Sequence, residues 1–350
     1  MSQQPPALEI TTTRNLTNWM AEQQVSLMVT TYEAGKLFSL GVQADGQLSV
    51  FERTMPRCMG LYATDDAQTL YVSTLYQIWR LERATQQDQI YRGYDGLYIP
   101  QSSSVTGDLD VHDLVLTDSG DLAFVATLFS CVAHASEKNS FAPIWKPRFI
   151  SKLAAEDRCH LNGLALRDGK PRYVTSVSTS DINNGWRDQR VDGGVVVDMD
   201  DDSIIADQLS MPHSPRWYKD KLWVLNSGLG EFGYIDSKTG AFEPVAFCPG
   251  YLRGMAFVNN YALVGLSRPR NNKTFSGLPL EDRLGMKNAS PRCGIQVINI
   301  DTGDIEHSLE FDGLVSELYD LVVLPGVTRP MTIGFQSEEI HHVLSIGDLI

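Results

Sequence analysis

The sequence has no excess of basic residues and no long apolar run. Among its 350 residues, 29 are lysine or arginine and 43 are aspartate or glutamate, a formal net charge of -14. So acidic a chain lacks the electrostatic attraction to phosphate on which nucleic-acid and anionic-membrane binding depend. No stretch approaches the roughly 18 apolar residues of a membrane span, and the first residues lack the basic and apolar regions of a signal peptide. We therefore predict a cytoplasmic protein that binds neither nucleic acid nor membrane.

Paired cysteines are also missing. The five cysteines lie far apart in the sequence, and none belongs to a CxxC pair. The sequence therefore predicts neither a disulfide framework nor a thiolate zinc site. We expect the five side chains to be reduced and buried.

Helical periodicity is nearly absent. Only residues 14–24 place apolar side chains three and four positions apart, which predicts one short amphipathic helix. Elsewhere, short segments rich in β-branched and aromatic residues alternate with turn residues, as at 70–74, 122–126 and 222–226. This pattern predicts an all-β fold.

One short pattern recurs six times along the chain. A polar residue comes first, a Gly or Asp usually follows three positions later, and an apolar strand comes next. The copies begin at Arg57, Asp110, His160, His213, Tyr251 and Glu317. Their starts lie 38 to 66 positions apart, about the length of one four-stranded blade with its loops. We predict a six-bladed β-propeller that forms a single domain over residues 1–350, with residues 1–24 as an N-terminal extension.

The two ends of the chain indicate how the ring closes. The last copy leaves too little sequence for four strands, whereas three apolar segments precede the first copy. We expect N-terminal and C-terminal strands to share the terminal blade, because this pairs strand edges that would otherwise be exposed. Three long inserts, 82–109, 133–158 and 268–292, are predicted to be loops on the propeller faces.

The starts of the innermost strands meet around the channel of a propeller, so candidate site residues gather there. Two positions after the copy starts, on the same strand face, stand Met59, His112, Asn162, Pro215, Arg253 and Tyr319. Imidazoles with a carboxylate form sites for divalent ions such as zinc, iron, manganese or calcium. We predict a metal site built from His160, His213, His112 and Asp110. The alternative role of these residues is hydrogen bonding between blades.

The same rings supply groups that suit an anionic substrate. Arg57 and Arg253 would orient such a substrate through bidentate hydrogen bonds, and Glu317 or Tyr319 would move protons. Further residues predicted to bind substrate are Asn162, Asn226, Arg216 and Trp186. Internal salt bridges are the alternative role of the arginines.

Two resemblances add to this interpretation. The segments Asn162-Gly-Leu-Ala, Tyr173-Val-Thr-Ser and Leu222-Trp-Val-Leu-Asn-Ser resemble six-bladed propellers of the gluconolactonase and regucalcin type. That resemblance implies a metal held at blade starts, with Glu317 and Asn162 in matching positions, while the remaining ligand positions hold His112, Pro215 or Arg253. The whole chain is more similar to an uncharacterised bacterial family of conserved hypothetical propellers, which implies the fold and no activity.

Two functions follow from these observations. The first is a metal-dependent enzyme that acts on a small polar or anionic substrate in the central channel, with hydrolase, lyase, isomerase and oxygenase chemistry all open. The second is a non-catalytic scaffold whose face loops bind a ligand or a protein partner.

Overall fold

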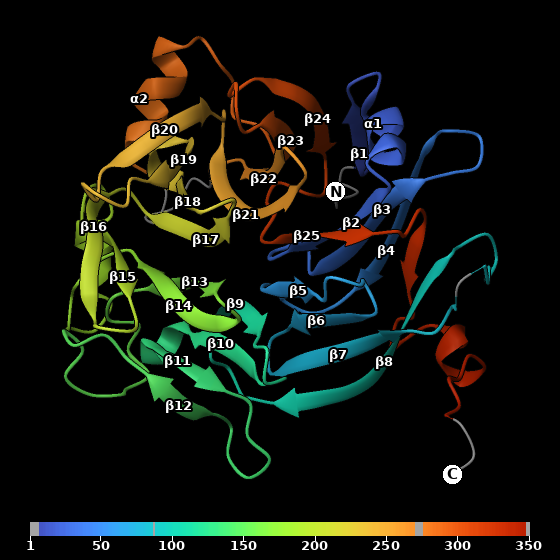
Figure 1. The fold of residues 1–350 in the computed structure, drawn as a ribbon, viewed down its shortest axis with the longest axis horizontal. Coiled ribbons are helices and arrows are strands. Elements are labelled where there is room, and N and C mark those ends of the chain that lie inside the picture. The colour runs from blue at the N-terminus through green and yellow to red at the C-terminus, as the bar shows by residue number, and fades with distance from the viewer. Residues whose placement is uncertain (1–6, 87, 270–275, 348–350) are drawn as a thin grey trace, which may run out of the picture.

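The computed structural model describes residues 7–86, 88–269 and 276–347, which form six small sheets arranged in a ring (Figure 1). The predicted six-bladed β-propeller is confirmed. Each innermost strand begins within four residues of the start of one copy of the repeated pattern. These strands are β5 (Leu61–Ala63), β9 (Val111–Leu116), β13 (Leu161–Arg167), β17 (Pro212–Tyr218), β21 (Tyr251–Val258) and β25 (Leu321–Pro325).

In five blades the outer strands follow the inner strand in chain order. They are β6 (Thr69–Ser73), β7 (Gln77–Arg83) and β8 (Gly96–Val105); β10 (Leu122–Ala126), β11 (Cys131–His134) and β12 (Ala142–Trp145); β14 (Lys170–Ser176), β15 (Gly194–Asp198) and β16 (Ser203–Leu209); β18 (Lys221–Asn226), β19 (Glu231–Ile235) and β20 (Phe242–Phe247); and β22 (Tyr261–Ser267), β23 (Gly294–Asn299) and β24 (Ile305–Asp312).

The remaining blade joins the two ends of the chain, as predicted. Strand β25 pairs with β2 (Val25–Thr31), and β3 (Lys36–Val42) and β4 (Leu48–Thr54) complete the sheet. Two short strands extend the neighbouring blades: β1 (Glu9–Thr12) pairs with β24, and β26 (Pro330–Thr332) pairs with β8. Backbone hydrogen bonds of strands from both ends of the chain, β1 and β2 together with β25 and β26, therefore close the ring.

Two α-helices lie outside the blades. Helix α1 (Leu16–Glu22) falls within the segment predicted to be helical, and it buries Leu16, Trp19 and Met20. Helix α2 (Pro279–Met286) was not predicted, although Pro at its start and two acidic residues in its first turn favour a helix. In the part of the chain that the structure describes, neither helix is long and apolar enough to cross a membrane.

The interpretation of the three long inserts as loops was partly wrong. They contain β8, β12 and α2, while 270–275 of the third insert lies outside the described residues. Strand β8 is the clearest miss, because its second half is polar and exposed and carries no alternating apolar pattern. An outer strand has an edge facing solvent and needs fewer buried side chains than an inner one.

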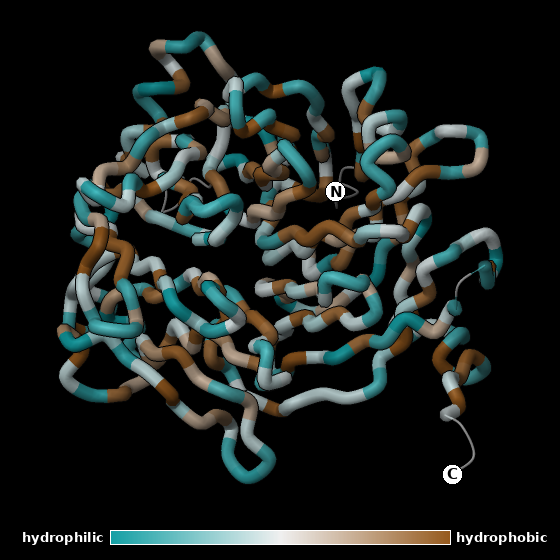
Figure 2. The backbone as a smooth tube through the Cα atoms, viewed as in Figure 1, coloured by the Kyte–Doolittle hydropathy of each residue, from teal (hydrophilic) through white to brown (hydrophobic). Residues whose placement is uncertain are grey.

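Apolar side chains from adjacent blades form the core. The hydrophobic clusters join neighbouring sheets, and hydrophilic residues predominate in the loops that project from the ring (Figure 2). All five cysteines are free and buried, as predicted. Apolar contacts between neighbouring blades thus hold the blades in place, and the starts of the inner strands converge around the channel.

Candidate active site

The turn into an inner strand is strained at four blades. Arg57, Asp110, His160 and Met211 have φ values of 49°, 56°, 54° and 48°. This left-handed conformation costs a non-glycine residue about 1–2 kcal/mol. The adjoining sheet overrides that cost, and the turn directs polar side chains into the channel. We call this end of the channel the histidine mouth, formed by Arg57, Asp110, His112, Asp157, His160, Asn162, His213, Arg253, Glu317 and Tyr319.

The structure changes the alignment of the fourth copy. His213 was aligned with His160, yet its geometry matches that of His112. In each case Nδ1 lies 2.8 Å from the carbonyl oxygen two residues earlier, on Met211 or Asp110, and that earlier residue has a positive φ. Each also follows the first residue of its inner strand. His112 and His213 therefore occupy equivalent positions, two blades apart.

The hydrogen bonds fix the tautomers of these two histidines. A carbonyl oxygen only accepts, so Nδ1 of His112 and of His213 must carry the proton and donate it. The Thr127 hydroxyl donates to the Leu161 carbonyl, so its oxygen also accepts from Nδ1 of His112, at 2.9 Å. Nε2 of each neutral ring is then a bare acceptor.

Burial keeps both rings neutral. Burial, with help from the charges of His160 and Arg253, lowers the pKa of His112 to about 4, against the opposing charge of Asp110. Burial and the charge of Arg253 hold the pKa of His213 well below its ordinary value. At neutral pH both side chains are therefore bases without charge.

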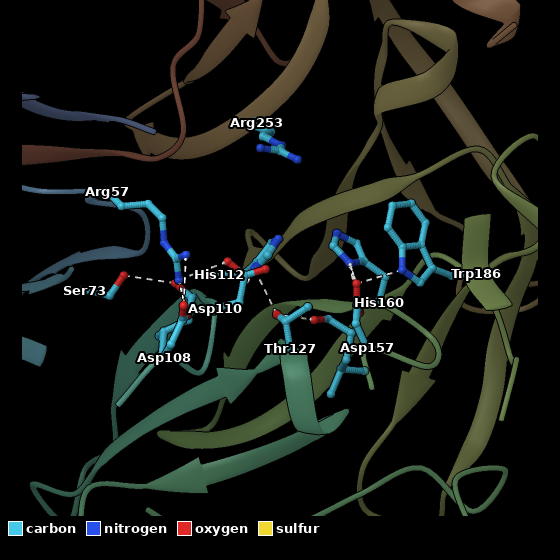
Figure 3. Close-up of polar contacts among 12 residues, drawn as sticks. Arg57, Ser73, Asp108, Asp110, His112, Thr127, Asp157, His160, Trp186 and Arg253 are labelled. Carbon is cyan, nitrogen blue, oxygen red and sulfur yellow. Dashed lines mark hydrogen bonds and ion pairs between the residues drawn. The ribbon is translucent and has the colours of Figure 1, made fainter. Parts of the chain in front are cut away.

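His160 has different partners. Its Nδ1 lies 3.0 Å from Oδ2 of Asp157, which also accepts a hydrogen bond of 2.7 Å from Nε1 of Trp186 (Figure 3). The ring of His160 stacks on Trp186 at 4.2 Å, and Arg187 covers Trp186 with its guanidinium carbon 4.4 Å from the ring centre. Burial alone would raise the pKa of Asp157, but the charge and hydrogen bond of His160 outweigh it and lower that pKa.

This Asp157–His160 pair was not predicted from the sequence. Asp157 precedes His160 by three residues, in the loop before β13 and outside the repeated pattern. Its own φ of 42° belongs to the same strained turn. An acidic residue three positions before a histidine at a blade start was the available signal. Trp186, predicted to bind substrate, contacts His160 and Asp157.

Arg253 and Tyr319 face the histidines across the channel (Figure 3 shows Arg253). Nη1 of Arg253 lies 3.1 Å from Oε1 of Glu317, and its guanidinium carbon lies 4.7 Å from the centre of the Tyr319 ring. The Tyr319 ring in turn lies 5.4 Å from the His112 ring, edge to face. Burial raises the pKa of Tyr319 well above its ordinary value, so its phenol keeps its proton and can donate. Arg57 pairs with Asp108 and Asp110.

Four buried side chains of the mouth carry polar atoms without a hydrogen-bond partner. They are Nδ2 of Asn162, Nε2 of His213, Nε of Arg253 and the hydroxyl of Tyr319. Each residue is exposed by no more than 8%. An unpaired buried polar group costs about 1–3 kcal/mol, and such groups are rare in folded proteins. Four of them at one mouth indicate a place prepared for a polar ligand.

Two other predicted substrate-binding residues have hydrogen-bond or ion-pair partners within the protein. Asn226 accepts a backbone hydrogen bond from Ser210 at 2.8 Å, within its blade. Arg216 lies deeper in the channel, where Nη1 is 2.8 Å from Oδ2 of Asp113 and Nη2 is 3.7 Å from Oδ1 of Asp320. We call Asp113, Arg216 and Asp320 the belt. The predicted internal salt bridge is thus the role that the structure gives Arg216.

The predicted metal ligands come only partly together. The rings of His112 and His160 lie 4.8 Å apart, edge to face, and Asp110 is held by Arg57. Within 7–86, 88–269 and 276–347, no three His, Cys, Asp or Glu side chains are grouped so that they could hold a metal ion. The metal therefore stays a prediction.

Comparisons with known proteins identify the family of the chain and support its fold. The family model described as Domain of unknown function (DUF4915) matches residues 14–333. The sequence matches none of the curated proteins with which it was compared. A chain from a crystal structure of the nidogen/laminin complex is 10% identical, with a TM-score of 0.53 over 86% of this chain and 99% of that one.

Two further solved structures are more distant. A protein of unknown function from Bacteroides caccae is 10% identical, with a TM-score of 0.48 over 86% of this chain and 98% of that one. An inactive virginiamycin B lyase from Staphylococcus aureus, with quinupristin, is 12% identical, with a TM-score of 0.41 over 87% of this chain and 99% of that one. At 10% identity, the likeness to the chain of the nidogen/laminin complex shows the fold and nothing about activity. The resemblance to gluconolactonase stays a prediction.

Proposed function

The chain belongs to the family described as Domain of unknown function (DUF4915), which names no activity, and we propose from the histidine mouth itself that the protein is an enzyme. Its substrate is a small polar molecule with an anionic group, and its chemistry is the transfer of a proton. The observation that carries this proposal is the Asp157–His160 pair, at a mouth that also holds four unpartnered polar groups.

Each residue has a distinct role in this proposal. Nδ1–H of His160 is held by Asp157, so Nε2 is free to take a proton from the substrate. The imidazolium that forms is stabilised by the Asp157 carboxylate and by the face of Trp186, on which it stacks. Arg253 binds the anionic group, and the protonated Tyr319 donates to oxygen that gains charge.

The two neutral histidines complete the binding site. Nε2 of His112 and of His213 accept hydrogen bonds, so they suit hydroxyl or amino groups on the substrate. A molecule with a carboxylate at one end and such a donor nearby would satisfy both sides of the mouth. Moving a proton within such a molecule gives isomerisation, and removing a proton while a neighbouring hydroxyl takes up a proton and leaves as water gives elimination. Both reaction classes were left open by the sequence.

A binding screen tests the proposal. We expect some members of a panel of hydroxy, keto and amino carboxylic acids to raise the melting temperature and to be consumed, as followed by proton NMR. Tyr319→Phe should weaken binding of any hit about tenfold, because one hydrogen bond to a charged group is lost. The matched control is Tyr71→Phe, in β6 and away from the mouth, which should leave binding unchanged.

The scaffold alternative predicts the opposite result. Turnover of none of the compounds, with equal binding by the Tyr319 and Tyr71 variants, would contradict an enzyme. A protein partner at the face loops would then be the stronger proposal. The cytoplasmic location also stays a prediction.

A divalent ion is a second proposal for the same mouth. One observation favours it: both His112 and His213 present Nε2 as an unprotonated donor, the form that binds a metal. On this proposal, elemental analysis of protein purified without a metal-affinity tag gives about one equivalent of metal, and His112→Gln/His213→Gln removes it without unfolding the protein. Metal-free protein that still binds a hit from the panel would contradict the ion and leave the proton-transfer proposal standing.

A further inference from the structure

The other end of the channel holds a cavity of about 520 Å³ that the proposed function does not use. The far ends of all six inner strands form its walls, and its aromatic residues are Tyr62, Trp217, Tyr218 and Phe257. Residues of the histidine mouth are not among those that line it. The belt lies between the two ends of the channel. Asp113 follows the mouth residue His112 on β9, and Asp320 follows the mouth residue Tyr319 directly before β25; both aspartates are buried.

Arg216 of the belt forms the polar floor of this cavity. Its Nη1 donates to Oδ2 of Asp113 at 2.8 Å and to the Pro215 carbonyl at 2.9 Å, and its Nη2 donates to Oδ1 of Asp113 at 3.3 Å. The carboxylates of Asp113 and Asp320 each also accept two backbone hydrogen bonds. The charges of Arg216, Asp113 and Asp320 therefore already have hydrogen-bond partners within the protein. A ligand in the cavity need not supply a counter-charge.

The charges of the belt disfavour a charged ligand. An anion in the cavity would meet two buried carboxylates behind Arg216, and a cation would meet the guanidinium itself. Either ion would also lose part of its hydration, and the one carboxylate that, among the described residues, lines the cavity outside the belt, that of Asp65, is exposed and screened by water. Aromatic walls, by contrast, favour a flat apolar body, and the planar guanidinium can stack on such a ring.

We propose that this cavity binds a small uncharged aromatic molecule, of about the size of one fused two-ring system. A volume of about 520 Å³ falls within the range of small-molecule sites. The proposal is independent of the chemistry at the histidine mouth, and either can fail without the other.

Protonation of the belt adds a pH dependence. Burial raises the pKa of Asp320 to about 7, with Arg216 opposing and the charge of Asp113 adding to the rise. The charged and titratable groups that face it are Arg216 from β17 and Asp113 from β9, and Tyr62 from β5 lies near Arg216. Below that pH the belt has no net charge, and above it the belt carries one negative charge.

Three probes that share the indole ring test the proposal: neutral 3-methylindole, cationic tryptamine and anionic indole-3-acetate. By calorimetry at pH 6, we expect 3-methylindole to bind at least tenfold more tightly than either ion. Between pH 6 and pH 8, tryptamine should gain on 3-methylindole severalfold, because Asp320 loses its proton. Equal binding of the three probes, or no binding of 3-methylindole at its solubility limit, would overturn the proposal.

Two variants locate the binding. Ala63→Phe places a ring into the cavity and should abolish binding of 3-methylindole, while Tyr319→Phe in the histidine mouth should leave it unchanged. Trp217→Leu, expected to weaken binding at least fivefold, serves if the first variant does not fold. Binding that survives in these cavity variants contradicts the assignment. A dimer that 3-methylindole dissociates would likewise overturn it, in favour of a second copy of the chain as occupant.

Discussion

We expect Asp157→Asn to reverse the tautomer of His160 and, in the proposed enzyme, to lower turnover by a factor of about 10² to 10⁴. The carboxylate of Asp157 accepts from both Nδ1 of His160 and Nε1 of Trp186. Asparagine has a single oxygen, and if Trp186 keeps it, the amide NH₂ turns toward Nδ1. Nδ1 must then accept, so the proton of His160 moves to Nε2 and blocks the base. Nitrogen-15 NMR of the imidazole reports this change without any substrate.

A second variant distinguishes the effect of the changed His160 tautomer from the effect of losing the Asp157 charge. In Asp157→Asn/Trp186→Phe the indole donor is gone, so the asparagine oxygen is free to accept from Nδ1. We expect the original tautomer and part of the turnover to return. If both variants keep the tautomer of the native protein, or if the double variant is the less active, the role given to Asp157 is wrong.

Arg216→Met destabilises the fold by about 3–5 kcal/mol, because it leaves Asp113 and Asp320 buried without their cation. The free energy of unfolding from urea titration measures this loss. The matched control is Arg148→Met, which removes a pair with Asp202 whose arginine side chain is 74% exposed. Such an exposed pair contributes less than about 1 kcal/mol. Equal losses in the two variants would contradict a central role for the belt.

The loss should depend on pH. Burial raises the pKa of Asp320 to about 7, whereas an unfolded chain releases this proton near about pH 4. The folded protein therefore gains stability from that proton, fully below about pH 4, and loses it as the pH rises through 7. Without Arg216, only protonation neutralises the buried carboxylates. Arg216→Met should therefore lower the free energy of unfolding more at pH 8 than at pH 5. An Asp320→Asn background should remove most of this difference.

The fold was predictable because the innermost strands carry the clearest pattern. Their turns are polar, and the first five residues of β9, β13 and β21 are all buried, so the copies stand out in the sequence. Outer strands such as β8 and β12 carry much weaker patterns. Their exposed positions accept serine, glutamine or proline, and the apolar alternation disappears.

The site was predictable only in part. The structure brings together His112, His160, Arg253 and Tyr319 because each lies near the start of an inner strand. Asp157 was missed because it stands in a loop, where no periodicity applies.

A change of strand register explains why Arg216 lies in the belt. The pairing of β17 with β18 shifts between His213 and Arg216. Such a bulge adds a residue and redirects the side chains beyond it, so Arg216 joins the belt and not the mouth. Sequence spacing alone does not reveal a bulge.

The pairing of β25 with β2 affects the order in which the protein can assemble on the ribosome. Strands β2 to β4 are made early, yet the inner edge of their sheet stays bare until residues 321–325 emerge. Glu317, Tyr319 and Asp320 emerge at the same moment. Nascent chains therefore gain a closed ring, a complete mouth and a complete belt together, once residues 317–325 have emerged.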